Sequence, residues 1–409
     1  MNRAMLLGLA LTIAAALWLP AGAGAAPAIT TRAEAAALID VTSGRLLYSQ
    51  QGDKPMLIAS LTKIMTAIVA IEHGNLSDKV KVGSNAYRKE GSSIYLQLGE
   101  EMKLSDMLYG MMLRSGNDAA TAIAEHVGGS VEGFAYMMNE KAKLIGMDHT
   151  NFRNPTGLNQ NEHYSTANDM ARLVAYAMKN PTFREIVKTK MKTAPNPNEP
   201  WDYKWKNKNK MLSLYDGADG VKTGYTKLAK RCLASSATRG GRQLAVVTLN
   251  DPDDWNDHAR LLNYGFANFP LERVIAKGDL VDLPGAGQRD SEGESGEGPQ
   301  GAAGASFYYP FMAGEQTSLS HKFSPNSPRS AAYRLGELGT LEYYLAGRKI
   351  GSVPIYVKND ARLLEPDRTA FGTEVVAVGA TGWERLAFAL RVTIRSLFDT
   401  EALGRWEQR

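Results

Sequence analysis

The sequence is poor in the residues that build disulfides and metal centres. It contains one cysteine, Cys232, in 409 residues, so no intramolecular disulfide can form. None of its six histidines lies in a His-Glu-x-x-His pair, and the acidic run at 251–254 lacks the glycine and final glutamate of a calcium loop. We therefore expect no metal and no cofactor, a solvated turn at 251–254, and Cys232 as a small buried strand residue.

Two further absences exclude other classes of protein. The formal net charge of +4 is spread along the chain without basic blocks, which gives no reason to expect a nucleic-acid partner. The sequence contains no Gly-x-Ser-x-Gly, so it lacks the nucleophile elbow of an ordinary α/β-hydrolase.

Both ends of the chain carry segments that indicate export and membrane contact. Residues 1–25 have the features of a signal peptide: Arg3, an apolar run of about 15 residues too short for a comfortable membrane span, and small residues at 23–25. A retained N-terminal anchor is the alternative. Residues 383–398 place Trp383 on an apolar stripe at helical spacing, with arginines off the stripe. This pattern predicts an amphipathic helix at the membrane surface, with docking on the protein itself as the alternative. We expect an exported protein at the outer face of the cytoplasmic membrane, in the cell-wall space.

In the first two thirds of the chain, the sequence predicts strands at both ends and helices between them. Residues 36–40 and 45–49 flank a turn and predict a hairpin, and the run 58–71, apolar nearly all round, predicts a helix in a domain centre. Further helices are predicted at 104–113, 119–127 and 167–178, a polar surface connection at 195–200, and strands at 233–238 and 243–249. This order favours an α+β fold with an antiparallel sheet packed with helices, whose strand order the periodicity does not determine.

The composition changes near residue 270. We expect a catalytic domain over 30–270 and a small β-rich domain over 271–365, with strands at 273–283, 339–345 and 349–357. A Gly/Ser/Glu-rich insertion at 285–305 is expected to form no core. Residues 366–409 would supply a linker and the amphipathic helix.

Three short motifs occur in a fixed order along the chain. They are the sole Ser-x-x-Lys, a Ser-Gly-Asn, and the sole Lys-Thr-Gly: Ser60 with Lys63, Ser115 with Asn117, and Lys222, Thr223 and Gly224. A second Ser-x-Asn at 324–326 breaks this order. Each motif alone is weak, since short patterns recur by chance, but the ordered set indicates an acyl-transfer site without histidine.

The first two motifs supply a nucleophile and its proton carriers. Ser60 needs a base, and Lys63 lies on the same helical face three residues later. Lys63 can act as a base only when neutral, which burial and the charge of Lys222 would favour by lowering its pKa. Ser115 would pass the proton between the leaving nitrogen and a lysine. Asn117 would hold a substrate amide or orient Lys63.

The third motif suits recognition of a peptide end. Lys222 and Thr223 would bind a carboxylate, and Gly224 would allow backbone contact with an extended peptide. The backbone N–H groups of Ser60 and Tyr225 would form an oxyanion hole.

At these residues the sequence resembles a known family. The motifs and their flanks at 114–120, 154–158 and 219–226 are similar to those of low-molecular-mass penicillin-binding proteins, and more narrowly of serine D-alanyl-D-alanine carboxypeptidases. The resemblance covers about 30–270 and extends weakly to about 365. It implies a penicillin-binding/β-lactamase-like transpeptidase fold followed by a small β-rich domain, and in many members a C-terminal amphipathic anchor. The implied activity is removal of the terminal D-alanine from peptidoglycan pentapeptide stems through an acyl-enzyme on Ser60. β-Lactams would be covalent inhibitors, and the role would be cell-wall maturation.

One departure and several alternatives accompany this resemblance. Some relatives hold the substrate carboxylate with an arginine before the helix after the last catalytic strand, but this chain has only acidic residues and proline at 251–254, so we expect no extra residue. A class A β-lactamase would need a deacylating glutamate, for which Glu162 and Glu185 are weak candidates. A transpeptidase or endopeptidase is a nearer alternative, and a non-catalytic wall-binding protein would be expected to have lost Ser60 or Lys63.

Overall fold

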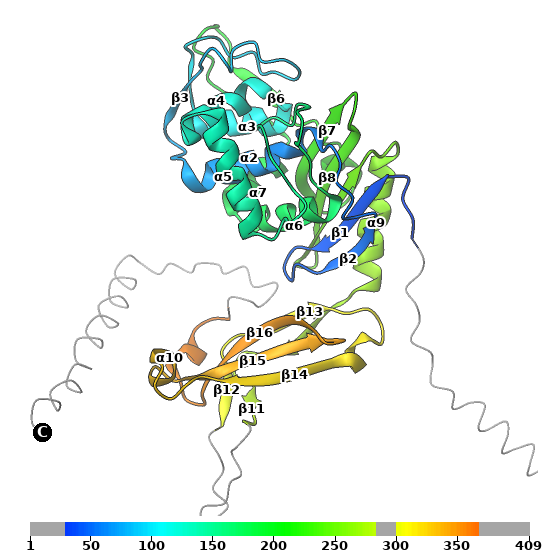
Figure 1. Cartoon of the computed structure of the whole chain (residues 1–409), viewed down its shortest axis with the longest axis vertical. Helices are drawn as coiled ribbons and strands as arrows, with labels where there is room; N and C mark the ends of the chain where they lie inside the picture. The colour runs from blue at the N-terminus through cyan, green and yellow to red at the C-terminus, as the bar shows by residue number, and fades with distance from the viewer. Residues whose placement is uncertain (1–28, 284–299, 368–409) are drawn as a thin grey trace, which may run out of the picture. The chain divides into compact units, whose positions relative to one another are not determined.

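The computed structural model describes residues 29–283 and 300–367 (Figure 1). The predicted signal peptide, most of the predicted insertion and the helix predicted over 383–398 lie outside the described residues. Within the described ranges, no helix is both long and apolar enough to cross a membrane.

A five-stranded antiparallel sheet forms the centre of the larger region, residues 29–269. Its strand order is β2 (Leu46–Gln50), β1 (Ala35–Asp40), β9 (Arg242–Leu249), β8 (Lys230–Arg239) and β7 (Ala218–Thr226). The predicted hairpin is β1–β2, and β8 and β9 contain the two strands predicted before residue 250. The order brings the N-terminal strands next to β9, so the sheet joins residues about 200 positions apart, such as Leu38 and Val246.

Side chains of successive strand residues enter different cores. In β1, Ala37 and Ile39 pack into the core formed with most of the helices, whereas Ala36 and Leu38 pack into the core formed with α9 (Asp254–Asn268). Both faces of the sheet are therefore covered, as the helices on either side of it in Figure 1 show.

Helix α2 (Thr62–His73) lies in the larger of these two cores. Its residues from Thr62 to Ala70 are all buried, which confirms the prediction from its apolar sequence. The surrounding helices are α3 (Leu104–Arg114), α4 (Asn117–Gly128), α5 (Val131–Leu144), α6 (Ala167–Ala177) and α7 (Pro181–Lys188). A short helix, α8 (Met211–Leu214), precedes β7, and two ribbons complete the region: β3 (Lys79–Lys81) with β4 (Glu101–Lys103), and β5 (Met191–Ala194) with β6 (Tyr203–Lys206).

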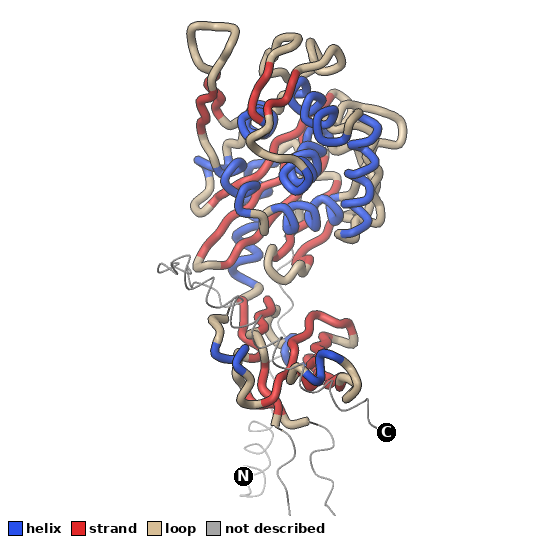
Figure 2. The backbone as a smooth tube through the Cα atoms, turned by 90° about the vertical axis from the view of Figure 1, so that its left-hand side faces the viewer, coloured by secondary structure: helices blue, strands red, loops and turns tan. Residues whose placement is uncertain are grey.

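The smaller region comprises residues 270–283 and 300–367, and its regular elements are mainly strands (Figure 2). A second antiparallel sheet has the order β11 (Leu280–Val281), β12 (Gly301–Ala303), β16 (Arg348–Val357), β15 (Glu337–Leu345) and β14 (Leu319–Pro325). β10 (Leu271–Ile275) pairs with β13 (Phe307–Pro310), and α10 (Ala331–Arg334) precedes β15. Both sheets belong to one compact unit, so the division into two domains at residue 270 stays a prediction.

Three local predictions need correction. Residues 273–283 form parts of two strands, because a turn at Lys277–Gly278 separates β10 from β11. Residues 301–303, predicted as part of a coreless insertion, form β12, whose small side chains are buried against β16. The surface connection predicted at 195–200 is confirmed, since this exposed segment is the turn of the β5–β6 hairpin. The acidic run is not a solvated turn, since Asp251 and Asp254 are buried and Asp254 begins α9.

Candidate active site

Ser60 lies in a tight turn in front of α2. A single 3-10 turn, Ala59–Leu61, carries it, and Ala59 has a φ of 46°, a left-handed conformation that alanine rarely adopts. The Thr62 hydroxyl donates to the Ala59 carbonyl over 2.9 Å and so fixes this turn. Ser60 is only half-buried, which leaves its hydroxyl within reach of a substrate.

Lys63 is buried one helical turn further on and faces Ser60. Its Nζ lies 3.1 Å from Ser60 Oγ. The same Nζ lies 2.7 Å from Asn117 Oδ1 and 2.6 Å from the Thr156 carbonyl oxygen. The Asn117 amide is oriented, because its Nδ2 donates to the Glu90 carbonyl over 2.6 Å.

These contacts make Lys63 suitable as a base. Burial lowers its pKa well below the ordinary value, and the nearby charge of Lys222 lowers it further. A neutral amine has two N–H donors and one lone pair. Asn117 Oδ1 and the Thr156 carbonyl can only accept, so they take both N–H groups and leave the lone pair for the Ser60 hydroxyl.

A second serine–lysine pair stands beside the first. Ser115 ends α3 with a φ of 67°, in the left-handed region, and Asn117 begins α4. Lys222 on β7 donates to Ser115 Oγ over 3.1 Å and to the Thr223 carbonyl over 2.6 Å. Burial lowers the pKa of Lys222 to about 7, with a further contribution from Lys208. The non-glycine residue in a left-handed conformation is a local strain of the kind that collects at functional sites.

Two glycines allow neighbouring segments to approach the turn Ala59–Leu61 that carries Ser60, here called the nucleophile turn. A Cβ on Gly224 would lie 3.2 Å from the Ser60 backbone nitrogen, so this glycine lets β7 pack against Ser60. A Cβ on Gly157, which has a φ of 81°, would lie 1.9 Å from the Ala59 carbonyl oxygen. The missing side chain of Gly224 therefore serves the protein's own turn, and the contact with an extended peptide expected at this glycine stays a prediction.

A cleft of about 480 Å³ opens at these residues. Ser60, Ser115, Thr223, Gly224 and Tyr225 line it, so the structure brings the three predicted motifs together. Three further motif residues lie behind the lining residues: Lys63, Asn117 and Lys222. Lys63 bonds to Ser60 and Asn117, and Lys222 bonds to Ser115.

Two cations in the cleft were not predicted. Lys208 lies 3.4 Å from Ser92 Oγ, and Arg231 on β8 donates from Nε to Asp254 over 3.1 Å and from Nη2 to the same carboxylate. The arginine sought near 251–254 is thus absent from that run, but a guanidinium from β8 lies against it. The Arg231–Asp254 pair crosses from strand to helix, which the local sequence does not indicate.

His163 supports the nucleophile turn from behind. The Arg153 backbone N–H donates to His163 Nδ1 over 3.0 Å, so Nε2 carries the proton and donates to the Thr62 hydroxyl over 2.9 Å. Burial lowers the pKa of His163 to about 4, which keeps the ring neutral. Thr62 in turn donates to Ala59, so the histidine acts on Ser60 through two hydrogen bonds.

Other residues singled out from the sequence lie elsewhere. Glu162 is exposed, and Glu185 is exposed on α7 and pairs with Lys188; neither lines the cleft. The second Ser-x-Asn lies at the end of β14 in the smaller region. Cys232 is buried in β8, as predicted, and burial raises the pKa of its thiol to about 12.

Comparison with known proteins identifies the family of this chain. A family profile described as D-alanyl-D-alanine carboxypeptidase matches residues 22–253. The chain belongs to this family. The D-alanyl-D-alanine carboxypeptidase DacF of Bacillus subtilis is 38% identical over 259 residues, which cover 61% of this chain and 66% of that relative. DacC of Escherichia coli, another D-alanyl-D-alanine carboxypeptidase, is 33% identical over 350 residues, covering 81% and 84% of the two chains.

The similarity to solved structures includes the smaller region. Penicillin-binding protein 5 of Haemophilus influenzae matches with a TM-score of 0.65 and 26% identity, covering 82% of this chain and 99% of that structure. The predicted penicillin-binding fold and the predicted family are therefore confirmed. The chain is a D-alanyl-D-alanine carboxypeptidase-family serine hydrolase.

Proposed function

We propose that this enzyme removes the terminal D-alanine from peptidoglycan pentapeptide stems through an acyl-enzyme on Ser60. The observation that carries this proposal is the environment of Lys63, whose two N–H groups face fixed acceptors while its lone pair faces Ser60 Oγ. General-base catalysis by a positioned group accounts for about 10²–10⁴ in rate.

Acylation would proceed in two bond changes. Ser60 Oγ attacks the carbonyl carbon of the penultimate D-alanine while Lys63 accepts its proton, and the backbone N–H groups of Ser60 and Tyr225 would bind the oxyanion. The C–N bond to the terminal D-alanine then breaks, and Ser115 would deliver a proton to the leaving amine and take up in its place the proton that Lys63 accepted. Its hydrogen bond to Lys222 supports this role. Water then attacks the ester, the C–O bond breaks, and Ser60 regains its proton.

The substrate carboxylate would bind at the β7 side of the cleft. Lys222 and Thr223 are the predicted partners, and Lys208 adds a positive charge along the same lining, whereas the charge of Arg231 is paired with that of Asp254. Charge-assisted hydrogen bonds to such groups are worth about 1.5–3 kcal/mol each. A preference for a free carboxylate end over a longer peptide is expected from the charges of Lys222 and Lys208.

β-Lactams would acylate the same serine, with opening of the ring C–N bond. The two glutamates considered for a β-lactamase lie away from the cleft, which supports slow release of the opened antibiotic rather than rapid hydrolysis. Because peptidoglycan lies outside the cytoplasm, we propose an exported enzyme of cell-wall maturation. The composition of residues 1–25 and 383–398 supports export and attachment to the membrane surface.

The test is release of D-alanine from a synthetic pentapeptide ending in D-Ala-D-Ala. We expect release by the wild-type chain without residues 1–25 and none by Ser60→Ala with the same circular dichroism spectrum. A cross-linked stem dimer is assayed in parallel. Cleavage of the dimer with no release of D-alanine would replace the carboxypeptidase proposal by an endopeptidase.

A further inference from the structure

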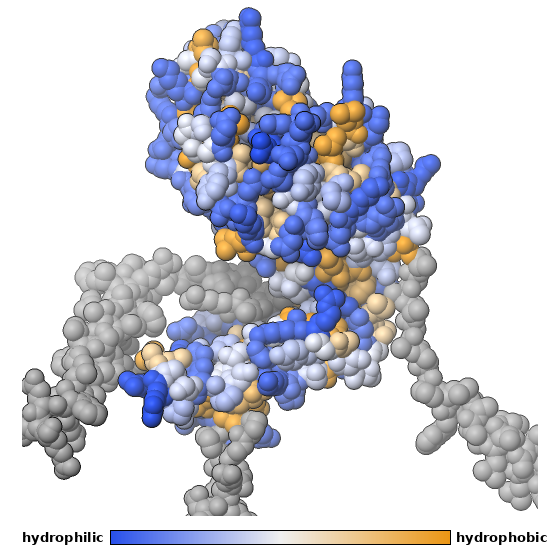
Figure 3. All heavy atoms as spheres, in the orientation of Figure 1, coloured by the Kyte–Doolittle hydropathy of each residue, from blue (hydrophilic) through white to orange (hydrophobic). Residues whose placement is uncertain are grey.

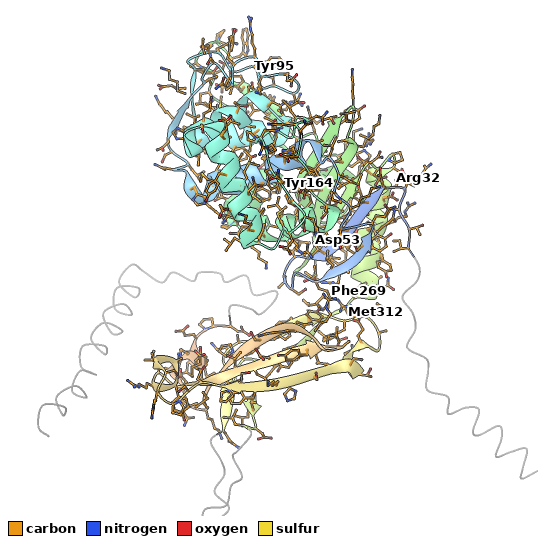
Figure 4. The ribbon with its side chains drawn as sticks, viewed as in Figure 1. Arg32, Asp53, Tyr95, Tyr164, Phe269 and Met312 are labelled. Atoms are coloured by element: carbon orange, nitrogen blue, oxygen red, sulfur yellow. The ribbon has the colours of Figure 1, made fainter. Side chains whose placement is uncertain are left out.

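A second hollow in the larger region, here called the loop pocket, lies between residues 93–97 and the turn of the β5–β6 hairpin. Its volume is about 700 Å³, within the ~300–1,000 Å³ typical of sites for small ligands. Tyr95, one of its lining residues, is labelled in Figure 4 among the loops at the end of the larger region away from Asp53.

Two buried carboxylates hold the walls of the loop pocket. Glu100 accepts from the Gln97 backbone N–H (2.8 Å), from Asn198 Nδ2 (2.8 Å) and from the Tyr203 hydroxyl (3.0 Å), so it ties the loop to the hairpin. Asp118 accepts from the Ser93 hydroxyl over 2.6 Å and from backbone N–H groups of the same loop. The pocket is thus built in advance, which reduces the entropy lost when a ligand binds.

The lining of the loop pocket combines exposed aromatic rings with planar polar groups. Trp201 is 65% exposed and Tyr95 79% exposed, and both line the pocket together with Asn196, Gln97 and Arg114. Most of the surface of the larger region in Figure 3 is hydrophilic, with small separate hydrophobic patches. A sugar ring has a face of C–H groups that packs on an aromatic ring and an edge of hydroxyl and amide groups that bonds to such planar side chains.

The charge of the loop pocket favours a neutral ligand. Arg114 and Lys204 contribute two positive charges to the lining, and Glu199 and Asp202 contribute two negative ones. A balanced set of charges gives no net attraction for a polyanion, whereas each charged group can still bond to hydroxyl or acetamido groups.

The loop pocket adjoins the catalytic cleft. Ser92 lines the cleft and Ser93 lines the pocket, and Arg114 of the pocket directly precedes Ser115 of the cleft. A five-residue stem can span at most about 17 Å when extended, at ~3.3–3.6 Å per residue. The end of the stem opposite the scissile bond is the end that carries the glycan.

We propose that the loop pocket binds the N-acetylated amino sugars to which the stem peptide is attached, with Trp201 as the stacking platform. This inference rests on the proposed function, because it places the glycan end of the same substrate. The enzyme would then bind a glycan-bearing stem more tightly than the bare peptide.

The test compares a disaccharide–pentapeptide with the bare pentapeptide as substrates of the wild-type chain, Trp201→Ala and Trp201→Phe. We expect the wild type to show a KM about five- to tenfold lower for the glycan-bearing substrate. Trp201→Ala should make the two KM values equal, and Trp201→Phe should keep most of the difference because it keeps a ring. Tyr136→Ala is the matched control, since Tyr136 is 67% exposed on α5 and does not line the pocket.

Binding of the disaccharide–pentapeptide to Ser60→Ala is titrated by calorimetry in parallel. Tighter binding of the glycan-bearing ligand, lost in Ser60→Ala/Trp201→Ala, would support the loop pocket even if neither substrate were hydrolysed, and only the proposed function would then fail. Equal affinity for both ligands, or a preference that survives removal of Trp201, would overturn the proposal and favour a protein partner for these exposed rings.

Discussion

Gly157 offers a sharp test of how the nucleophile turn is held. In Gly157→Ala the new Cβ would lie 1.9 Å from the Ala59 carbonyl oxygen and 2.8 Å from Thr62 Oγ1. The left-handed φ of 81° costs alanine about 1–2 kcal/mol, and overpacking adds about 1–3 kcal/mol. The predicted loss is about 2–5 kcal/mol of unfolding free energy. Since the clash pushes on the turn that carries Ser60, acylation should also slow about 10–100-fold.

Gly146 provides the matched control. Its φ is 72°, but a Cβ there would meet no atom within 4 Å. Gly146→Ala should therefore lose only the conformational ~1–2 kcal/mol and keep its acylation rate. Urea unfolding gives the stabilities, and the labelling rate with a fluorescent penicillin gives the acylation. Equal stability losses in the two variants, with equal labelling rates, would refute the packing of Gly157 against the nucleophile turn.

Three further predictions concern titratable groups of the site. Lys63→Met should retain the circular dichroism spectrum while the acylation rate falls about 10²–10⁴-fold, and an unchanged rate would exclude Lys63 as the base. Lys222, with a pKa of about 7, must be charged to bind a carboxylate. The kcat/KM for a substrate ending in a free carboxylate should fall as pH rises through about 7, whereas that for an amidated analogue should not show this fall. His163 has a pKa of about 4, below the ordinary 6.5, so the unfolded chain takes up its proton first as pH falls. Stability should decrease from about pH 6.5 to pH 4 by about 3 kcal/mol from this group, and His163→Asn, measured by urea unfolding, should lose less over that range.

Part of the fold follows directly from local sequence. The run at 58–71 is apolar on every side, and helix α2 is accordingly buried from Thr62 to Ala70. The predicted hairpin forms as β1–β2, and the strands predicted at 233–238 and 243–249 pair as β8 and β9. Their order in the sheet could not be predicted, because the pairing of β1 with β9 joins segments some 200 residues apart and leaves no local pattern.

The sequence shows the side chains of the site, but not the backbone carbonyl and the hydrogen-bond relay that position them. Serine, lysine and asparagine positions are visible as motifs, whereas the Thr156 carbonyl that orients Lys63 is a backbone group, which any residue type could supply. The relay from His163 to Ala59 likewise depends on a fold that brings position 163 against position 62. Asp254 was misjudged for the same reason, since it begins helix α9 and its partner Arg231 comes from strand β8.

The assignment of Ser60 as the nucleophile is tested most directly by locating the residue to which penicillin attaches. The chain without residues 1–25 is incubated with benzylpenicillin and examined by intact-mass spectrometry, followed by peptide mapping. We predict one stable covalent adduct on Ser60 that is absent from Ser60→Ala. A well-folded protein that forms no adduct, or forms it on another residue, would contradict the assignment of Ser60 as the nucleophile.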